Sequence, residues 1–403
     1  MSKPFLKHII VLLFLLCPFA NSFGQKKLLK KFLSNEKDTT RSSSFLPLPA
    51  AGYSQETGIE VGLVPLYSFY TDRQDTTVRS SSITGVATIT TKKQLNLHLK
   101  SDIWSPGNKY HYQGELRYKY FPLNFYGIGS ATRQADEQLI TQKLVRLGAD
   151  IEKKSGRLTY TGINLSFDQY RFNYGNSNPG MFNNSLGDFI FPNPNQDVEG
   201  KDGGKVLFAG ISQILDSRNS NTYPTKGIYM RLNYSYAPDF FGKGNFNGSF
   251  VKFDFRGFKS LNSKLMLGLN ANYQTLQGKS LPFYLLPQLG NDQMMRGYYS
   301  GRYRDQNLMA AQAELRYRFN PRFGLVGFVG TGAVYQNGSG GVFKNDTGRQ
   351  LMLSQFKPSY GGGFRYFFDV ERGLSVRMDY GIGEKRPGEK RQTGVYFGLG
   401  ESF

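Results

Sequence analysis

The chain has 403 residues, a formal net charge of +20 and a hydrophobic content of only 39%, with 15% aromatic residues. After the N-terminal segment no run approaches 18 continuous apolar residues, which excludes helical membrane spans. The single cysteine, Cys17, lies in that segment, so the rest of the chain must be held together by hydrogen bonds and packing rather than by disulfides.

Residues 1–24 have the pattern of a secretory signal peptide. Two lysines precede an apolar run at 9–16, and small residues suit cleavage before Gln25. A lipoprotein signal at Cys17 is the alternative, although Leu16 stands where a small residue is expected. Because an exported basic chain meets anionic lipids, we expect outer-membrane lipids and lipopolysaccharide as partners, and no nucleic acid.

Residues 25–43 form a short basic segment, "QKKLLKKFLSNEKDTTRSS", which we expect to lie in the periplasm. It carries an apolar cluster at 28–33. The segment is compatible with a short helix on the membrane surface and equally with a disordered tail.

From residue 44 to 403 the chain alternates between apolar and polar residues with period two. In "LSVRMDYGIG" at 374–383, for example, Val376 and Met378 fall on one face and Arg377 and Asp379 on the other. Runs of about ten such residues are long enough for a tilted strand to cross a bilayer. We expect strands near 42–55, 57–69, 79–90, 93–104, 109–120, 139–153, 156–172, 204–217, 226–237, 246–259, 262–275, 307–319, 322–335, 355–368, 372–383 and 391–403.

This pattern predicts an all-β protein, a 16-stranded antiparallel transmembrane β-barrel. A soluble sandwich also alternates, but aromatic residues gather at strand ends as in a membrane girdle, and the chain closes on an aromatic strand. With the C-terminus in the periplasm, the long connections 173–203 and 336–354 lie on the extracellular side. The turn in "TTKKQ" also lies on the extracellular side, although it is very short, and this fits the predicted topology less well.

Several motifs resemble the BamA/TamA superfamily, also called the bacterial surface antigen family. They are "MRGYY" at 295–299, "DSRNSNTYPTKG" at 216–227, "SYGGGFRYFFDVERGLSVRMDYG" at 359–381 and the terminal "VYFGLGESF". The resemblance covers most of the mature chain. It implies that the periplasmic turn motif comprises Asp216, Arg218, Asn219, Pro224 and Gly227.

In that family the sixth extracellular loop folds into the barrel, and its arginine pairs with acids on the next two strands. The resemblance therefore implies a loop lock made by Arg296, Gly297, Tyr298, Glu314 and Asp379. Here Gly330, in "FVGTG", stands where the second acid is expected, so Asp379 is the candidate substitute. Alternation in the terminal strand places Phe403 on one face with Val395, Phe397 and Leu399. A terminal strand that ends in phenylalanine resembles the assembly signal of many outer-membrane barrels, which implies the barrel assembly machinery as a partner during biogenesis.

The resemblance also implies a place in the outer membrane of a Gram-negative bacterium. Family members carry periplasmic POTRA domains, but 25–43 is too short for one, so we expect a barrel-only member. The expected function is outer-membrane protein assembly, polypeptide translocation or lipid transport by a plugged barrel, with a separate periplasmic or surface protein. Pro47 and Pro49, which donate no ladder hydrogen bonds, suggest a weak seam between the first and last strands.

Two other classes of function fit the sequence less well. A passive narrow pore or structural barrel is the alternative, but it needs an open lumen. An outer-membrane enzyme is not expected, because both histidines of the mature chain, His98 and His111, face inward on their strands, away from the lipid side. The spacing also predicts no metal site, and no cofactor-binding motif is found.

Overall fold

The computed structural model describes residues 41–403 except 55, 175–198, 243–244, 338–350 and 371–372. The expected signal peptide (1–24) and most of the basic segment (25–43) lie outside the described residues, as do large parts of the connections 173–203 and 336–354.

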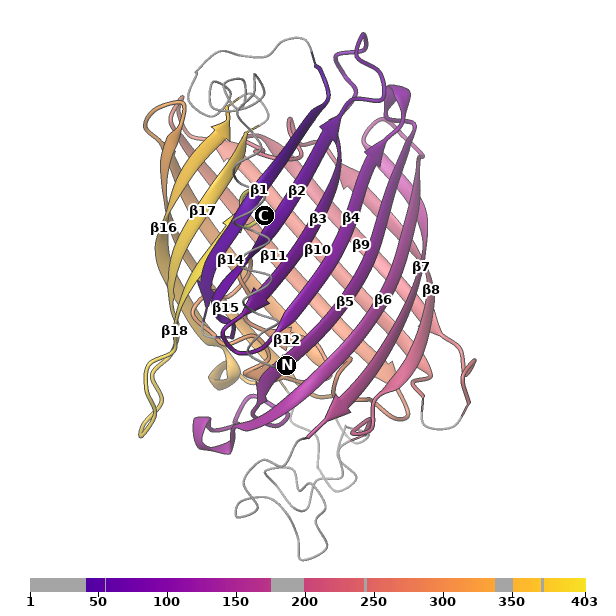
Figure 1. Cartoon of the computed structure of the whole chain (residues 1–403), viewed down its shortest axis with the longest axis vertical. Helices are drawn as coiled ribbons and strands as arrows, with labels where there is room; N and C mark the ends of the chain where they lie inside the picture. Colours follow the sequence, from indigo (N-terminus) through magenta and orange to yellow (C-terminus); the bar gives the residue numbers. More distant parts are fainter. Residues whose placement is uncertain (1–40, 55, 175–198, 243–244, 338–350, 371–372) are drawn as a thin grey trace, which may run out of the picture.

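Sixteen antiparallel strands form one sheet that curves into a nearly closed barrel (Figure 1), which confirms the predicted fold class. In pairing order they are β1 (Ser44–Ser54), β2 (Gly58–Phe69), β3 (Ser81–Thr90), β4 (Leu95–Trp104), β5 (Tyr110–Phe125), β6 (Gln138–Lys154), β7 (Thr159–Asn173), β8 (Gly204–Asp216), β9 (Gly227–Ala237), β10 (Gly248–Ser260), β11 (Leu265–Gly278), β14 (Asn307–Arg318), β15 (Phe323–Tyr335), β16 (Lys357–Asp369), β17 (Leu374–Ile382) and β18 (Thr393–Leu399).

Short elements occur in the connections. Strands β12 (Gln288–Leu289) and β13 (Tyr303–Arg304) pair with each other between β11 and β14. Three 3-10 turns complete the described secondary structure: η1 (Pro106–Asn108), η2 (Gln134–Asp136) and η3 (Leu353–Gln355). In the described part of the chain, no helix is long and apolar enough to span a membrane.

The alternation of side chains sorts the strand residues onto two faces. On β17, Val376 and Met378 are 39% and 46% exposed on the outside, whereas Arg377 and Asp379 are 2% and 1% exposed on the inside. Leucine, isoleucine and tyrosine cover the outside of most strands, as Ile163 and Leu165 do on β7. The outer surface is therefore apolar and the inner wall polar, as in a barrel that faces lipid.

The two ends of the barrel differ in their connections. The longer connections, including 126–137, 279–306 and 383–392, lie at one end, here called the loop end, at the bottom of Figure 1. The tight turns 155–158 and 261–264 lie at the other end, here called the turn end. The predicted short turn in "TTKKQ" does lie at the loop end, where Gln94 donates a 2.7 Å hydrogen bond to the carbonyl of Glu56.

The connection 279–306 is buried over most of its length. Its apolar residues pack against the inner wall of β5 and β6, where Phe283 meets Phe125 with ring centroids 5.2 Å apart. A second apolar cluster joins Leu289, Met295 and Tyr298 to the inner face of β14. This connection accounts for much of the packed interior at the loop end.

Strands β1 and β18 end the sheet and lie side by side (Figure 1), yet no ladder of hydrogen bonds joins them in the described part of the chain. A Cβ atom placed on Gly52 would lie 3.5 Å from the Cβ atom of Phe397. The barrel therefore has one seam, between β1 and β18, where two strands touch without regular pairing.

Candidate functional site: the barrel interior and the seam

Arg296 lies at the centre of a buried group of charges. Its guanidinium is fully buried, pairs with Glu314 on β14, and donates a 2.6 Å hydrogen bond to Asp379 on β17. It also stacks over the ring of Phe328, 3.5 Å from the ring centroid. An arginine fork between two carboxylates is a strong and geometrically specific contact.

The charges around Arg296 belong to a larger network on the inner face of β14, β16 and β17. Glu314 also accepts a hydrogen bond from Arg316 at 2.9 Å. Asp379 also accepts hydrogen bonds from Arg365 at 2.5 Å and Arg377 at 3.1 Å. Glu401, which follows β18, accepts a 2.8 Å hydrogen bond from Arg365. The network ties three strands, the connection 279–306 and the chain after β18 together.

The backbone around Arg296 explains why the motif needs glycine and tyrosine. Gly297 has φ +109°, and a Cβ atom there would lie 2.7 Å from the carbonyl carbon of Ile382. The backbone N–H of Gly297 donates to the hydroxyl of Tyr396 at 2.9 Å. Tyr298 donates to the carbonyl of Pro358 at 2.6 Å. Burial raises the pKa of the Tyr298 hydroxyl, which keeps it a neutral donor.

Gly330 lies opposite Gln312 in the β14–β15 pair, and Asp379 makes the second contact with Arg296. A Cβ atom on Gly330 would lie 2.9 Å from the carbonyl oxygen of Ala311. The position has no room for a side chain unless the neighbouring strand moves. The geometry thus explains how the carboxylate two strands away serves Arg296 when position 330 is a glycine.

The turn between β8 and β9 is built by the residues of the second motif. Asp216 accepts hydrogen bonds from the backbone N–H and the guanidinium of Arg218 at 2.9–3.1 Å, and it also pairs with Arg79. The Asn219 side chain accepts two backbone N–H bonds of 3.0 Å at residues 225 and 226. Pro224 is buried. Gly227 has φ +100°, where a Cβ atom would lie 2.3 Å from the carbonyl oxygen of Ser217.

This turn, 217–226, also reaches other parts of the turn end, which the sequence did not indicate. The ring of Tyr223 meets Phe367 of β16 edge-on at 5.0 Å, and Asn221 donates a 3.2 Å hydrogen bond to the carbonyl of Ser80 before β3. Strands β3 and β16 lie far from β8 and β9 in the sheet order. The turn therefore bridges separate parts of the barrel rim.

The prediction that Phe403 shares a face with Phe397 and Leu399 is wrong. β18 ends at Leu399, Gly400 has φ +76°, and the chain then turns inward. Phe403 is 7% exposed and packs against Phe258 and Met266 on the inner wall. Its carbonyl accepts a 3.0 Å hydrogen bond from Arg316. The positive φ at Gly400 breaks the alternation on which the prediction depended.

Both histidines lie on the inner wall beside carboxylates. His98 is 3.1 Å from Glu115, and His111 lies between Glu152 at 2.6 Å and Asp102 at 3.2 Å. The ring of His111 also stacks on Trp104 with centroids 3.8 Å apart. Among the residues that the structure describes, no three or more histidine, cysteine, aspartate or glutamate side chains are placed so that they could hold a metal ion.

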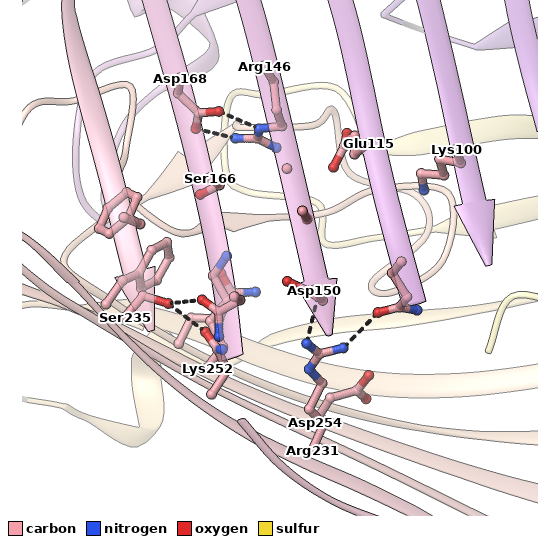
Figure 2. A pocket seen from close by; sticks show the side chains of 18 of the residues that line it. Lys100, Glu115, Arg146, Asp150, Ser166, Asp168, Arg231, Ser235, Lys252 and Asp254 are labelled. Atoms are coloured by element: carbon pink, nitrogen blue, oxygen red, sulfur yellow. Dashed lines mark hydrogen bonds and ion pairs between the residues drawn. The ribbon is translucent and has the colours of Figure 1, made fainter. Parts of the chain in front are cut away.

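A polar cavity of about 930 Å³ lies inside the barrel, and residues 284–291 form part of its wall. Figure 2 shows its charged lining, in which Arg146 holds Asp168 through two 2.7 Å hydrogen bonds and Arg231 donates to Asp150 at 2.8 Å. Acidic and basic side chains thus form ion pairs along the cavity wall. The sequence alternation predicted polar inward faces but not which charges pair, because pairing depends on the register between strands.

The register of β1 shows what its prolines do at the seam. Pro47 of β1 lies directly opposite Pro65 of β2 within a continuous ladder. Two prolines exchange no N–H bonds, so the bonds to β2 come from the even-numbered residues of β1. The backbone groups of Pro47 and Pro49 then point away from β2, toward the free edge of β1. The free edge of β1 lacks two donors where a closed barrel would need them.

The fold and its two faces define a sixteen-stranded barrel of the outer-membrane type. The chain belongs to the Omp85 superfamily, whose domain matches residues 84–403. This confirms the resemblance that the motifs indicated. No curated protein sequence matches the chain significantly.

Solved structures show the same fold. BamA from Haemophilus ducreyi lacking POTRA domains 1–3 is 11% identical with a TM-score of 0.54, over 93% of this chain and 81% of that one. CdiB from Escherichia coli is 9% identical with a TM-score of 0.54, over 93% and 74%. CdiB from Acinetobacter baumannii is 12% identical with a TM-score of 0.53, over 90% and 66%, so the chain spans just under two thirds of that protein.

Proposed function

We propose that this barrel lies in the outer membrane of a Gram-negative bacterium and inserts or translocates polypeptides, or lipid, through the seam between β1 and β18. The main support for this proposal is the seam. Strands β1 and β18 touch without a ladder of hydrogen bonds, so separating them costs less free energy than separating two paired strands of the barrel. Membership of the Omp85 superfamily and the apolar outer surface support the membrane location. The turn end then faces the periplasm.

In this proposal the connection 279–306 is a plug held by the lock of Arg296, Glu314 and Asp379. Its burial and ion pairs support that role. Residues 1–24 are a signal peptide, 25–43 a periplasmic segment and 44–403 the barrel. Phe403 marks the chain for the barrel assembly machinery, and a separate periplasmic or surface protein supplies the substrate. Outer-membrane lipids and lipopolysaccharide surround the barrel, and no catalytic step is involved.

The alternative is a passive narrow pore or a structural barrel. The polar cavity of about 930 Å³ favours it, because such a cavity holds water. The two functions differ in whether the seam must open.

A disulfide across the seam tests the proposal. Cysteines replacing Gly52 and Phe397 would have Cβ atoms about 3.5 Å apart, within disulfide range. The native chain without its signal peptide has no other cysteine. In proteoliposomes the reduced protein should speed the folding of an unfolded outer-membrane barrel substrate. The oxidised protein should lose that effect and regain it with reductant, whereas each single-cysteine variant should stay active. Equal activity of the oxidised and reduced forms would exclude a seam that opens.

A further inference from the structure

Arg304 differs from the other deeply buried arginines of the barrel interior. Arg296, Arg302, Arg316, Arg365 and Arg377 each pair with a carboxylate. Arg304 is only 2% exposed, yet no carboxylate lies within ion-pair distance of it in the described part of the chain. Its guanidinium donates one 3.4 Å hydrogen bond to the carbonyl of Gly301, and its Nε has no partner.

Aromatic rings around Arg304 compensate its charge only in part. The guanidinium carbon lies 5.0 Å from the ring centroid of Phe125 and 5.9 Å from that of Phe283. Burial lowers the pKa of Arg304 to about 10, so the side chain still carries its charge at neutral pH. A buried cation without an anion is unfavourable, and a bound anion would relieve that cost.

Arg304 lines a second cavity, of about 310 Å³, which also contains Lys119. The ammonium of Lys119 lies 4.1 Å from the ring centroid of Phe121 and makes no ion pair among the described residues. Three acids also line this cavity, but two are engaged: Glu56 accepts a 2.7 Å hydrogen bond from the backbone of Ser300, and Asp292 pairs with Arg377. Glu60 is the third. Among the described residues, none of these acids forms an ion pair with Arg304 or Lys119.

The rest of the cavity wall mixes apolar and polar side chains and leads to the seam. On one side lie the side chains Leu123, Ile140, Phe172 and Phe283. On the other side the cavity reaches Gly52 of β1 and both Tyr396 and Phe397 of β18. Tyr396 is buried inside, whereas Phe397 is 41% exposed on the outer surface. The cavity therefore extends from the buried cations to the strand that borders lipid.

We propose that this cavity binds the phosphate head group of a membrane lipid that enters through the seam, with Arg304 and Lys119 holding the phosphate. The inference rests on the proposed function only for the position of the seam in a bilayer. An arginine fork and an ammonium are the side chains that bind phosphate oxygens best. The volume lies at the lower end of the range for small-ligand pockets, roughly 300–1,000 Å³. It suits a head group, while the acyl chains remain outside along Phe397.

The test uses purified protein in maltoside detergent and dihexanoylphosphatidylglycerol, a soluble short-chain phospholipid, followed by titration calorimetry. Saturable binding is expected. Arg304→Gln and Lys119→Gln should each weaken it about tenfold, as expected for the loss of one charge-assisted contact. The matched control is Lys252→Gln. Lys252 is a luminal lysine of the larger cavity, 4.4 Å from the ring centroid of Phe250, and its loss should leave the affinity unchanged.

Two further ligands separate the phosphate from the acyl chains. Dihexanoylglycerol, which has no phosphate, and inorganic phosphate, which has no chain, should each bind at least tenfold more weakly than the phospholipid. Inorganic phosphate binding as tightly as the phospholipid would overturn the lipid assignment. Unchanged affinity in Arg304→Gln, or an equal loss in Lys252→Gln, would overturn the site.

Folding of each variant is checked by its heat-modifiable migration on gels. If Arg304→Gln does not fold, Lys119→Gln and Arg304→Lys carry the test, and the latter should keep most of the affinity. Because binding is measured in detergent without any protein substrate, a negative result here leaves the insertion assay under Proposed function unaffected, and the reverse also holds.

Discussion

At the scale of single residues, the contacts of Arg296 determine how the connection 279–306 is held. Removing one partner of a buried ion pair costs roughly 3–5 kcal/mol, because the other charge stays buried. Here Glu314 keeps Arg316 and Asp379 keeps Arg365, so the remaining charges are still paired. Replacing Arg296 should therefore lower the free energy of unfolding by an amount at the lower end of this range, about 3 kcal/mol.

Arg296→Ala and Glu314→Ala should each loosen the connection. Protease cleavage within 279–306 should increase, and the temperature at which the barrel unfolds on gels should fall. The double variant should be less destabilised than the sum of the two single variants, because both lose the shared contact between Arg296 and Glu314. Additive effects would show that the two side chains do not act together.

Some of this residue-scale picture could be predicted from the sequence. Alternation places Glu314 and Asp379 on the inner face, and the Arg-Gly-Tyr motif indicates Arg296. The lone guanidinium of Arg304 could not be foreseen, since nothing local in "GRYRD" distinguishes Arg302, which meets Glu389, from Arg304, which meets no acid. Partners far apart in sequence depend on strand register, which no local pattern encodes.

At the scale of elements, the turn 217–226 shows how a short motif fixes backbone geometry. Gly227 combines a positive φ with a close approach to Ser217, whereas Gly388 in the connection 383–392 has φ +76° and nothing within 4 Å of a Cβ atom. Comparing these two glycines separates the cost of a strained backbone from the cost of a steric clash with a neighbouring residue. An alanine at positive φ costs of order 1 kcal/mol, and a steric clash adds to that cost.

Gly227→Ala should therefore lower the unfolding temperature clearly more than Gly388→Ala does, measured by the same gel assay. It should also free Tyr223 from Phe367 and so increase cleavage of the turn by protease. Equal effects of the two substitutions would mean that the turn tolerates a side chain at 227 and that its packing is loose.

The elements themselves follow from the sequence more closely than their contacts do. Period-two runs place the strands within a few residues, because alternation between an inner polar face and an outer apolar face persists only along a strand. The last strand was predicted to run to residue 403, whereas β18 ends at Leu399. A single glycine, Gly400, turns the chain inward, and alternation alone carries no signal for such a turn.

At the scale of the whole molecule, the barrel has a filled loop end, a bridged turn end and one seam. The connection 279–306 and the network around Arg296 fill the loop end, and the turn 217–226 bridges the turn end. Between them lies the polar cavity of about 930 Å³. Such an arrangement holds water but offers ions no wide path, which supports the proposal that the protein acts at the seam rather than along the barrel axis.

Conductance of the purified protein in planar bilayers tests this account most directly. The intact barrel should give small, unsteady currents, and deletion of residues 291–304, which removes Arg296 and its neighbours, should raise them several-fold. A control deletion of the exposed tip of the connection 383–392, residues Pro387 and Gly388, should leave them small. A large, steady conductance from the intact protein would contradict the account and identify the barrel as a passive pore.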